Sequence, residues 1–216
     1  MDFATARSSL IAQMRREIKD ERVLQAMEEV PRELFVPTES RDLAYEDRPL
    51  PIGMGQTISQ PFIVALMTMA LELRGGERVL EVGTGSGYQA AILAHLAGQV
   101  VTVERQEKLA ETARDILARL GYTNVEVHVA EKTLGWRAAA PYDAILVSAG
   151  APEVPPELLG QLAVGGRLVI PVGSRYEQEL IKVTRWQNRE VMERLGACRF
   201  VPLVGEGAWQ TEGSQP

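Results

Sequence analysis

The sequence predicts an α/β fold built on a central, mostly parallel sheet, and three observations indicate it. An apolar run of strand-forming residues, 78–82, leads directly into a glycine cluster at 83–87. A helix-like segment, 89–96, follows the cluster. From there to residue 172, short apolar runs alternate with amphipathic segments. Strands that alternate with helices are typical of a parallel sheet covered by helices, so the glycines mark its first strand-to-helix turn.

Two helices are expected before the first strand. Apolar residues recur at helical spacing in two short segments, and Pro31 ends the second. These segments hold too few apolar residues for a core of their own, so we expect them to form a cap on the sheet. The residues that predict the two helices are Leu10, Met14 and Ile18 for the first and Val23, Leu24, Met27 and Val30 for the second.

A long loop without secondary structure is expected from Tyr45 to Gln60. Loops of this length inside a compact domain are uncommon and are often functional. Pro61 then starts a helix that is expected to reach Leu73 and to stop at Gly75-Gly76. Ser59 therefore lies at a helix N-terminus, where its simplest role is that of a capping residue.

The remaining elements follow in an order that favours one domain over residues 1–216. Residues 1–60 supply the helices and the loop, 61–173 the core of the sheet, and 174–210 a run of strands and turns without helices. That run predicts an antiparallel extension of the sheet, with Pro202 at an edge or a bulge. The small polar tail, 211–216, is expected to fray. The expected strands are 78–82, 100–104, 125–129, 142–147, 167–172, 179–186, 191–195 and 199–204, and the later helices are 89–96, 106–120 and 156–162.

The glycine motif predicts the kind of ligand. Its pattern is Glu81-x-Gly83-x-Gly85-x-Gly87, not the Gly-x-Gly-x-x-Gly of dinucleotide dehydrogenases. An acidic residue at the end of the first strand disfavours a pyrophosphate and suits a cationic ligand such as S-adenosylmethionine. Glu104 ends the next strand, where a carboxylate can accept hydrogen bonds from both ribose hydroxyls. Each feature alone is compatible with an ordinary turn or a solvated helix start, but the two acids together favour S-adenosylmethionine as cofactor, with S-adenosylhomocysteine as product.

Composition excludes several other classes of protein. The net charge of −6 disfavours general nucleic-acid binding. One cysteine, Cys198, allows no intramolecular disulfide, and two histidines supply no evident metal site. Neither a membrane-spanning apolar run nor a signal peptide is evident, so we expect a cytoplasmic protein without a membrane association.

Several segments resemble the protein-L-isoaspartate O-methyltransferase family, over roughly residues 23–209. The glycine motif by itself indicates only a methyltransferase, whereas the segment Thr57-Ile58-Ser59-Gln60-Pro61 is far more specific. The segments that carry the resemblance are 47–53, 55–61, 80–90, 140–145, 165–173 and 199–203.

The resemblance implies a fold, a reaction and a set of site residues. The fold would be the Rossmann-like fold of class I S-adenosylmethionine-dependent methyltransferases. The enzyme would methylate the free α-carboxylate of L-isoaspartyl residues in damaged proteins, and the ester would close to a succinimide whose hydrolysis restores some normal aspartate. A monomer acting on isoaspartyl proteins and peptides is expected. The implied residues are Ser59 for catalysis; Thr57, Ile58, Gln60, Glu81, Gly83, Thr84, Gly85, Ser86, Gly87, Glu104, Arg105 and Glu131 for the cofactor; and Ser59, Val201, Pro202 and Leu203 for the substrate.

The sparse set of catalytic side chains agrees with this chemistry. A peptide carboxylate with a pKa near ~4 is already ionised at pH 7, so no general base is needed. Ser59 is therefore interpreted as a hydrogen-bond partner that orients the carboxylate. The chain has no Gly-x-Ser-x-Gly elbow that would make Ser59 a nucleophile.

One segment departs from the family pattern. Members usually carry Gly-Asp-Gly after the third strand, with the aspartate on the adenine amino group, but this chain has Ala130-Glu131-Lys132. If the position of Lys132 requires a left-handed backbone, its Cβ would introduce strain of about 1–2 kcal/mol. The departure leaves two alternatives open: a methyltransferase for another substrate, or a cofactor-binding relative without catalysis.

Overall fold

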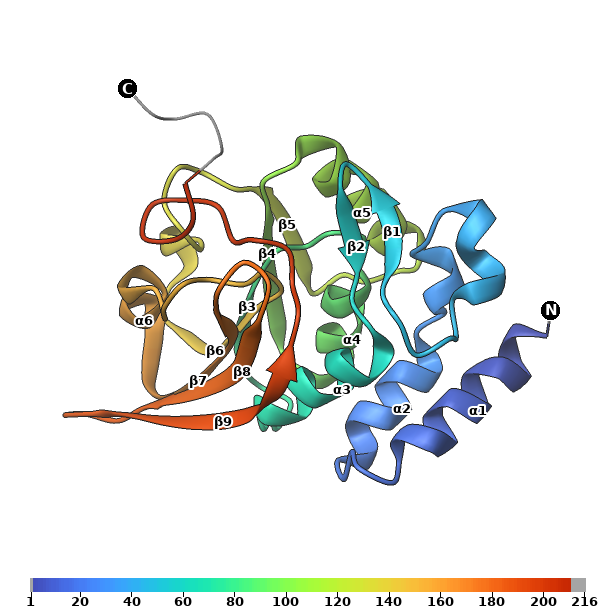
Figure 1. Cartoon of the computed structure of the whole chain (residues 1–216), viewed down its shortest axis with the longest axis horizontal. Helices are drawn as coiled ribbons and strands as arrows, with labels where there is room; N and C mark the ends of the chain where they lie inside the picture. The colour runs from blue at the N-terminus through green and yellow to red at the C-terminus, as the bar shows by residue number, and fades with distance from the viewer. Residues whose placement is uncertain (1, 211–216) are drawn as a thin grey trace.

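The computed structural model describes residues 2–210, and a seven-stranded sheet forms its centre (Figure 1). The tail that was expected to fray, 211–216, lies outside the described residues. The strand order is β5-β4-β3-β6-β7-β8-β9. Pairing is parallel from β5 to β7 and antiparallel between β7, β8 and β9. The strands are β3 (Arg78–Val82), β4 (Gln99–Glu104), β5 (Val125–Val129), β6 (Tyr142–Val147), β7 (Leu162–Gly173), β8 (Gln178–Arg185) and β9 (Glu190–Cys198).

The strand order reverses direction between β3 and β6. After β3 the chain builds outward through β4 and β5, then returns to pair β6 with β3 on the other side. Ligands of open α/β sheets bind beyond the carboxyl ends of the strands at such a point. The expected α/β fold is therefore confirmed, and its topology places a crevice at the carboxyl ends of β3 and β6.

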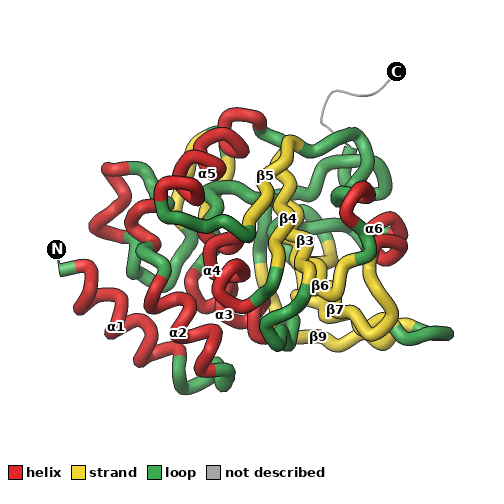
Figure 2. The backbone as a smooth tube through the Cα atoms, turned by 180° about the vertical axis from the view of Figure 1, so that it is seen from behind, coloured by secondary structure: helices red, strands yellow, loops and turns green. Residues whose placement is uncertain are grey.

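Two apolar layers cover the two faces of the sheet. Alternate residues of each strand point to opposite faces, so Val79 and Val100 join one cluster while Leu80 and Val101 join the other. Figure 2 shows α4 (Tyr88–Leu96) and α5 (Glu107–Arg119) on one side of the strands and α6 (Pro156–Gln161) on the other. The crossover helices thus bury both faces of the parallel part of the sheet.

The two N-terminal helices pack on this core as a cap. They are α1 (Phe3–Met14) and α2 (Glu21–Glu29), and the side chains of Asp2 and Asp20 cap them. Their buried apolar residues belong to the same cluster as α3 and α4. Ile18 is buried with them but lies in the connection after α1.

The segment 45–60 is not a structureless loop, so that prediction was wrong. It contains a small antiparallel hairpin, β1 (Leu50–Gly53) and β2 (Gln56–Ile58). Its turn has left-handed backbone at Gly53, Met54 and Gly55. Strands of three and four residues carry too little periodicity to be recognised. Two 3-10 helices precede the hairpin, η1 (Arg32–Leu34) and η2 (Thr38–Leu43).

Helix α3 (Pro61–Ala70) begins where expected but ends before Leu73. Glu72 adopts a left-handed backbone with φ of 52° and ends the helix, so Gly75 and Gly76 do not stop it. Arg167 satisfies the helix terminus by donating to the carbonyls of Leu71 and Glu72, each at 2.7 Å. This tertiary cap has no local sequence signal.

The C-terminal part agrees with the predicted antiparallel extension in β8 and β9, whose hairpin projects from the body of the molecule (Figure 1). The expected last strand, 199–204, was wrong. Its pairing is limited to isolated bridges, one between Gly150 and Pro202 and one between Val204 and Trp209. None of the helices in residues 2–210 is both long and apolar enough to cross a membrane.

A glutamine side chain of α6 holds the segment that follows β5. Gln161 is buried, accepts the Trp136 amide at 2.9 Å and donates to the Leu134 carbonyl at 2.8 Å. Gly135 lies between these two contacts with φ of +80°, and a Cβ on it would lie 2.6 Å from Gln161 Oε1. The close approach therefore requires glycine at this position.

We predict that Gly135→Ala lowers the free energy of unfolding by at least about 1–2 kcal/mol, since it adds left-handed strain and displaces Gln161. Thermal denaturation of the purified variant measures the loss. Gly160→Ala is the matched control, because Gly160 lies in α6 and a Cβ added there would have nothing within 4 Å. Equal melting temperatures for both variants would contradict the role given to this contact.

Candidate functional site

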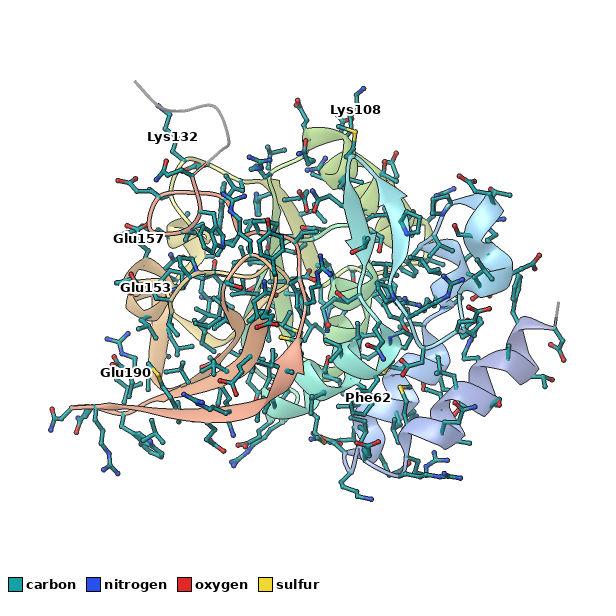
Figure 3. All side chains as sticks on the ribbon, in the orientation of Figure 1. Phe62, Lys108, Lys132, Glu153, Glu157 and Glu190 are labelled. Carbon is teal, nitrogen blue, oxygen red and sulfur yellow. The ribbon has the colours of Figure 1, made fainter. Side chains whose placement is uncertain are left out.

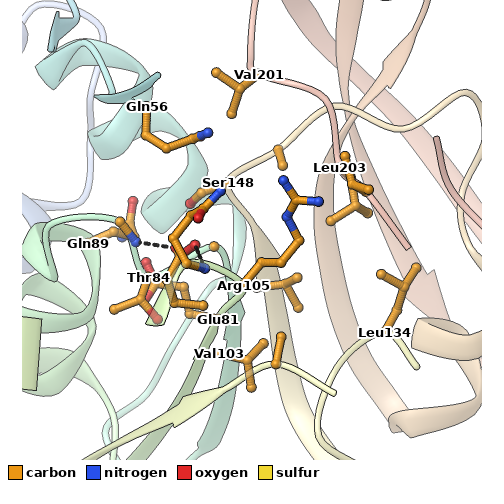
Figure 4. A pocket seen from close by; sticks show the side chains of 18 of the residues that line it. Gln56, Glu81, Thr84, Gln89, Val103, Arg105, Leu134, Ser148, Val201 and Leu203 are labelled. Carbon is orange, nitrogen blue, oxygen red and sulfur yellow. Dashed lines mark hydrogen bonds between the residues drawn. The ribbon is translucent and has the colours of Figure 1, made fainter. Parts of the chain in front are cut away.

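A cavity lies at the carboxyl ends of β3, β4 and β6 (Figure 4). The sheet supplies its floor, the hairpin segment one wall, and the segments after β5 and β9 the opposite wall. The lining residues are 56–59, 64, 81–86, 88, 89, 103–106, 130–135, 148, 149 and 201–204.

The glycine turn brings backbone to the cavity surface. Gly83 and Gly85 have φ of 99° and 52°, and both line the cavity. A Cβ on Gly83 would lie 3.4 Å from Ser148, and one on Gly85 would lie 3.3 Å from Ile52. The backbone at these two positions therefore forms a cradle for a ligand, and a side chain at either position would narrow the cavity. Gly87 instead caps α4 and packs against Ala113 and Leu117 of α5, outside the cavity lining.

Glu104 is a carboxylate held in a fixed position at the end of β4. It is 7% exposed, its Oε2 accepts from the Gly85 amide at 2.8 Å, and its Oε1 accepts from the Gln106 amide at 2.9 Å. Each carboxylate oxygen has a second lone pair that can accept from a ligand hydroxyl. Arg105 follows and extends its side chain into the cavity (Figure 4).

Glu81 is a fully buried carboxyl group at the cavity floor. Thr102 donates to its Oε2 at 2.6 Å, Thr84 and Thr102 share a hydrogen bond of 2.6 Å, and Oε1 has no partner among residues 2–210. Burial raises the pKa of Glu81 to about 8, Thr102 opposes this shift, and the nearby Glu104 adds to it. A buried carboxyl with one unpaired oxygen is suited to a ligand ammonium group, so the residues present fit a cationic amino-acid cofactor.

Ser59 faces the same cavity from the segment between β2 and α3. Its carbonyl accepts from Arg32 Nη2 at 2.8 Å. The capping role considered for Ser59 belongs to Asp47, which accepts from the Phe62 amide at 2.8 Å. Asp47 also binds the Gln60 side chain at 2.9 Å, so Gln60 does not line the cavity as it was expected to do. The Ser59 hydroxyl is therefore free of the helix terminus.

The segment Ala130-Glu131-Lys132 forms the rim of the cavity, and both charged residues are exposed. Figure 3 places Lys132 at the outer edge of the molecule. Within residues 2–210, the non-glycine residues with left-handed backbone are Met54 and Glu72. Lys132 thus avoids the strain considered for this position, because the left-handed turn occurs later, at Gly135.

The C-terminal segment closes the cavity opposite the hairpin. Val201 and Leu203 are held by the backbone of Gly150, with two hydrogen bonds of 2.8 Å. The structure brings every predicted site residue to the cavity lining except Gln60 and Gly87. Those that line it are Thr57, Ile58, Ser59, Glu81, Gly83, Thr84, Gly85, Ser86, Glu104, Arg105, Glu131, Val201, Pro202 and Leu203.

Sequence reasoning missed several lining residues. Ser148 and Ala149 follow β6, and the rule that ligands bind at strand carboxyl ends could have found them. Other lining residues come from the hairpin and from helices, and no role in the site was predicted for them from the sequence. They are Gln56, Val64, Tyr88 and Gln89. Residues 2–210 contain no group of three His, Cys, Asp or Glu side chains arranged to hold a metal ion.

Comparison with known proteins assigns the chain to a family. The family model for protein-L-isoaspartate(D-aspartate) O-methyltransferase matches residues 5–208. The chain belongs to this family. Relatives named protein-L-isoaspartate O-methyltransferase are 56% identical over 197 residues in Syntrophus aciditrophicus, covering 90% of each chain, and 53% identical over 215 residues in Geobacter metallireducens, covering 98% of this chain and 100% of the relative.

Solved structures agree with this assignment. One protein-L-isoaspartate O-methyltransferase superposes with a TM-score of 0.83 at 31% identity, covering 94% of this chain and 67% of the other. A Plasmodium falciparum structure described as a putative member of the family, in complex with S-adenosyl-L-homocysteine, superposes with a TM-score of 0.77 at 28% identity, covering 89% and 95% of the two chains. The expected class I methyltransferase fold is thereby confirmed.

The buried Glu81 predicts a pH dependence of stability. Its folded pKa of about 8 exceeds the ordinary value of 4.5, so the folded protein binds more protons than the unfolded chain between these values. The contribution of Glu81 protonation to the free energy of unfolding is fully present below pH 4.5 and is lost as the pH rises through about 8. We expect the free energy of unfolding of the ligand-free protein to fall over this range relative to that of Glu81→Gln.

Denaturant unfolding at several pH values, on the wild type and Glu81→Gln, measures the difference. Glu107→Gln, an exposed carboxylate at the start of α5, is the control and should follow the wild type. Parallel curves for the wild type and Glu81→Gln would show that Glu81 does not titrate in this range.

Proposed function

We infer that the protein transfers a methyl group from S-adenosylmethionine to the free α-carboxylate of L-isoaspartyl residues in damaged proteins, which starts their repair through a succinimide. The observation that carries this inference is that Ser59 shares one cavity with Glu81, Glu104 and the glycine turn. The family-specific segment and the cofactor motif, about twenty residues apart in the sequence, thus form one site. Membership of the protein-L-isoaspartate O-methyltransferase family supports the same reaction.

Different residues of the cavity would contact different parts of the cofactor. Glu104 would accept from the ribose hydroxyls, Glu81 would face the ammonium group, and Glu131 at the rim would accept from the adenine amino group. The cradle of Gly83, Thr84, Gly85 and Ser86 would receive the remainder of the ligand by close backbone approach. Thr57, Ile58 and Arg105 line the same space and would contact the cofactor.

When bound, S-adenosylmethionine supplies an electrophilic methyl group on a sulfonium. Ser59 orients the substrate carboxylate by a hydrogen bond from its hydroxyl, so that one oxygen faces the methyl group in line. Such positioning can contribute roughly 7–11 kcal/mol to lowering the barrier. Neither histidine of the chain, His95 or His128, lines the cavity, which agrees with a nucleophile that is already ionised.

The apolar residues of the walls keep water away from the reacting groups. Ile58 and Leu203 are buried side chains on opposite walls, and Val201 and Pro202 lie beside Leu203. When the methyl group passes from the sulfonium to the carboxylate, the C–S bond breaks and the C–O bond forms, and a neutral thioether and a neutral ester replace the two ions. A surrounding of low polarity therefore favours the transition state over the separated ions. We propose that the segment 201–203 also holds the substrate peptide.

The partner proposals follow from charge and from the origin of the cavity. The net charge of −6 supports proteins and peptides as substrates in preference to nucleic acid. One copy of the chain brings Ser59, Glu81 and Glu104 to the same cavity, so the proposed monomer needs no residue of a second copy for these contacts.

The reaction is tested by incubating the protein with methyl-labelled S-adenosylmethionine and two matched peptides, one isoaspartyl and one aspartyl. We expect base-labile label on the isoaspartyl peptide alone. Absence of label from both peptides, with cofactor binding established separately, would overturn the proposal.

Ser59→Ala is predicted to lower kcat by about 10–100-fold while the dissociation constant of S-adenosylhomocysteine changes by less than about threefold. The reason is that a hydrogen bond to a charged group contributes about 1.5–3 kcal/mol and is made to the substrate rather than to the cofactor. Steady-state kinetics and calorimetric titration measure the two quantities. Ser9→Ala, at an exposed position of α1, is the control, and unchanged kcat in Ser59→Ala would remove Ser59 from the mechanism.

Glu104→Ala is predicted to weaken S-adenosylhomocysteine binding by about 100-fold or more. It removes the acceptor for the ribose and leaves the amides of Gly85 and Gln106 without their partner, at about 1.5–3 kcal/mol for each charged hydrogen bond. Calorimetric titration checks the affinity, with the exposed Glu107→Ala as control. An affinity equal to that of the control would mean that Glu104 does not contact the cofactor.

A further inference from the structure

Arg32 is a buried cation that the reaction described above does not use. It lies in η1 and is 0% exposed. Its hydrogen-bond acceptors are two backbone carbonyls rather than carboxylates: Nε donates to Ala44 and Nη2 to Ser59, each at 2.8 Å. Nη1 has no partner among residues 2–210. Burial of a charge without a carboxylate partner is unfavourable, and an apolar side chain of similar volume often serves packing better.

The contacts of Arg32 connect it to two residues of the cavity lining. Ser59 is one of them, through its carbonyl. Tyr88 is the other, because the guanidinium lies 4.8 Å from the centre of the Tyr88 ring. Arg32 itself lies behind the cavity wall and does not line it. Any action of Arg32 on the reaction therefore passes through these neighbours.

A second anchor acts on the other side of Ser59. Asp47 holds the Gln60 side chain at 2.9 Å and the Phe62 amide at 2.8 Å. The peptide of Ser59 is thus fixed between the guanidinium at its own carbonyl and the carboxylate at the following residues. Asp47 explains where α3 begins, whereas Arg32 fixes the peptide group of Ser59 itself.

We propose that Arg32 is a positioning residue for methyl transfer, whose planar guanidinium holds the Ser59 peptide so that the Ser59 hydroxyl meets the substrate carboxylate. The proposal rests on the inferred methyl transfer to isoaspartyl residues. The guanidinium presents donors in a fixed planar arrangement that reaches the carbonyls of Ala44 and Ser59 together. Lysine keeps the charge but presents a single ammonium group, so Arg32→Lys tests the geometry and not the charge.

Arg167→Lys is the matched control. Arg167 also donates to backbone carbonyls, those of Leu71, Glu72 and Gly165, but outside the cavity. We expect Arg32→Lys to lower kcat at least tenfold, with the dissociation constant of S-adenosylhomocysteine within threefold of the wild type. Arg167→Lys should leave kcat within twofold, even where its melting temperature falls. Equal kcat values for the two variants would overturn the proposal.

A double-mutant cycle with Ser59→Ala separates positioning from a general loss of structure. The readout is the affinity of an isoaspartyl peptide for the enzyme saturated with S-adenosylhomocysteine, which needs no turnover. Each single substitution should lower the affinity for the peptide. When Ser59→Ala is already present, adding Arg32→Lys should lower that affinity by less than a further twofold. Effects that multiply would show that Arg32 does not act through Ser59.

A second variant and an assay of the wild type complete the experiment. Arg32→Gln, which removes the buried charge and retains an amide donor, replaces Arg32→Lys in the same cycle if the lysine variant does not fold. The wild type is assayed first on the isoaspartyl and aspartyl peptides. Failure there refutes the proposed function, whereas an active wild type with an unimpaired Arg32 variant refutes the positioning role alone.

Discussion

The hydrogen bond from the Gly85 amide to Glu104 connects the two strands on which the site depends. Glu104 ends β4, and Gly85 lies in the turn after β3, so the bond fixes the turn at the switch point of the sheet. The Glu81–Thr102–Thr84 hydrogen bonds repeat this connection one layer deeper. The same carboxylate that shapes the turn presents its remaining lone pairs to the cavity. Structure and ligand binding therefore share one group, which is why its removal is expected to affect both.

The other half of the cavity depends on contacts that are remote in sequence. Ser59 reaches it because the β1–β2 hairpin lies against the glycine turn and because Arg32 and Asp47 hold the chain on either side. The N-terminal cap and the segment after it thus contribute more than cover for the sheet. The segment after the cap includes Arg32, whose guanidinium lies behind the cavity wall. Through its hydrogen bond to the Ser59 carbonyl, this segment contacts the residue proposed to orient the substrate.

The departure at Ala130-Glu131-Lys132 is accommodated by anchors further along the chain. Gln161 holds the backbone at Leu134 and Trp136, and the left-handed turn occurs at Gly135. The charged rim residues are exposed and can differ without disturbing this anchor. Glu131 consequently keeps a carboxylate at the rim, where an adenine contact is proposed, although its neighbours differ from the family pattern.

Local patterns of residues were sufficient to predict the parallel core, the antiparallel extension and the cofactor motif, because strand and helix periodicity and the glycine turn are local signals. The same patterns predicted that Glu81 and Glu104 belong to one site, since both lie in apolar strands whose carboxyl ends meet at one edge of the sheet. The folded structure was needed to establish the hairpin at 50–58, the end of α3 at Glu72 and the lack of a continuous strand over 199–204. It likewise decided that Gln60 binds Asp47, that Gly87 packs on α5, and that Arg32 holds Ser59. These features depend on hydrogen bonds and packing between residues distant in the chain, and no local pattern of residues records such contacts.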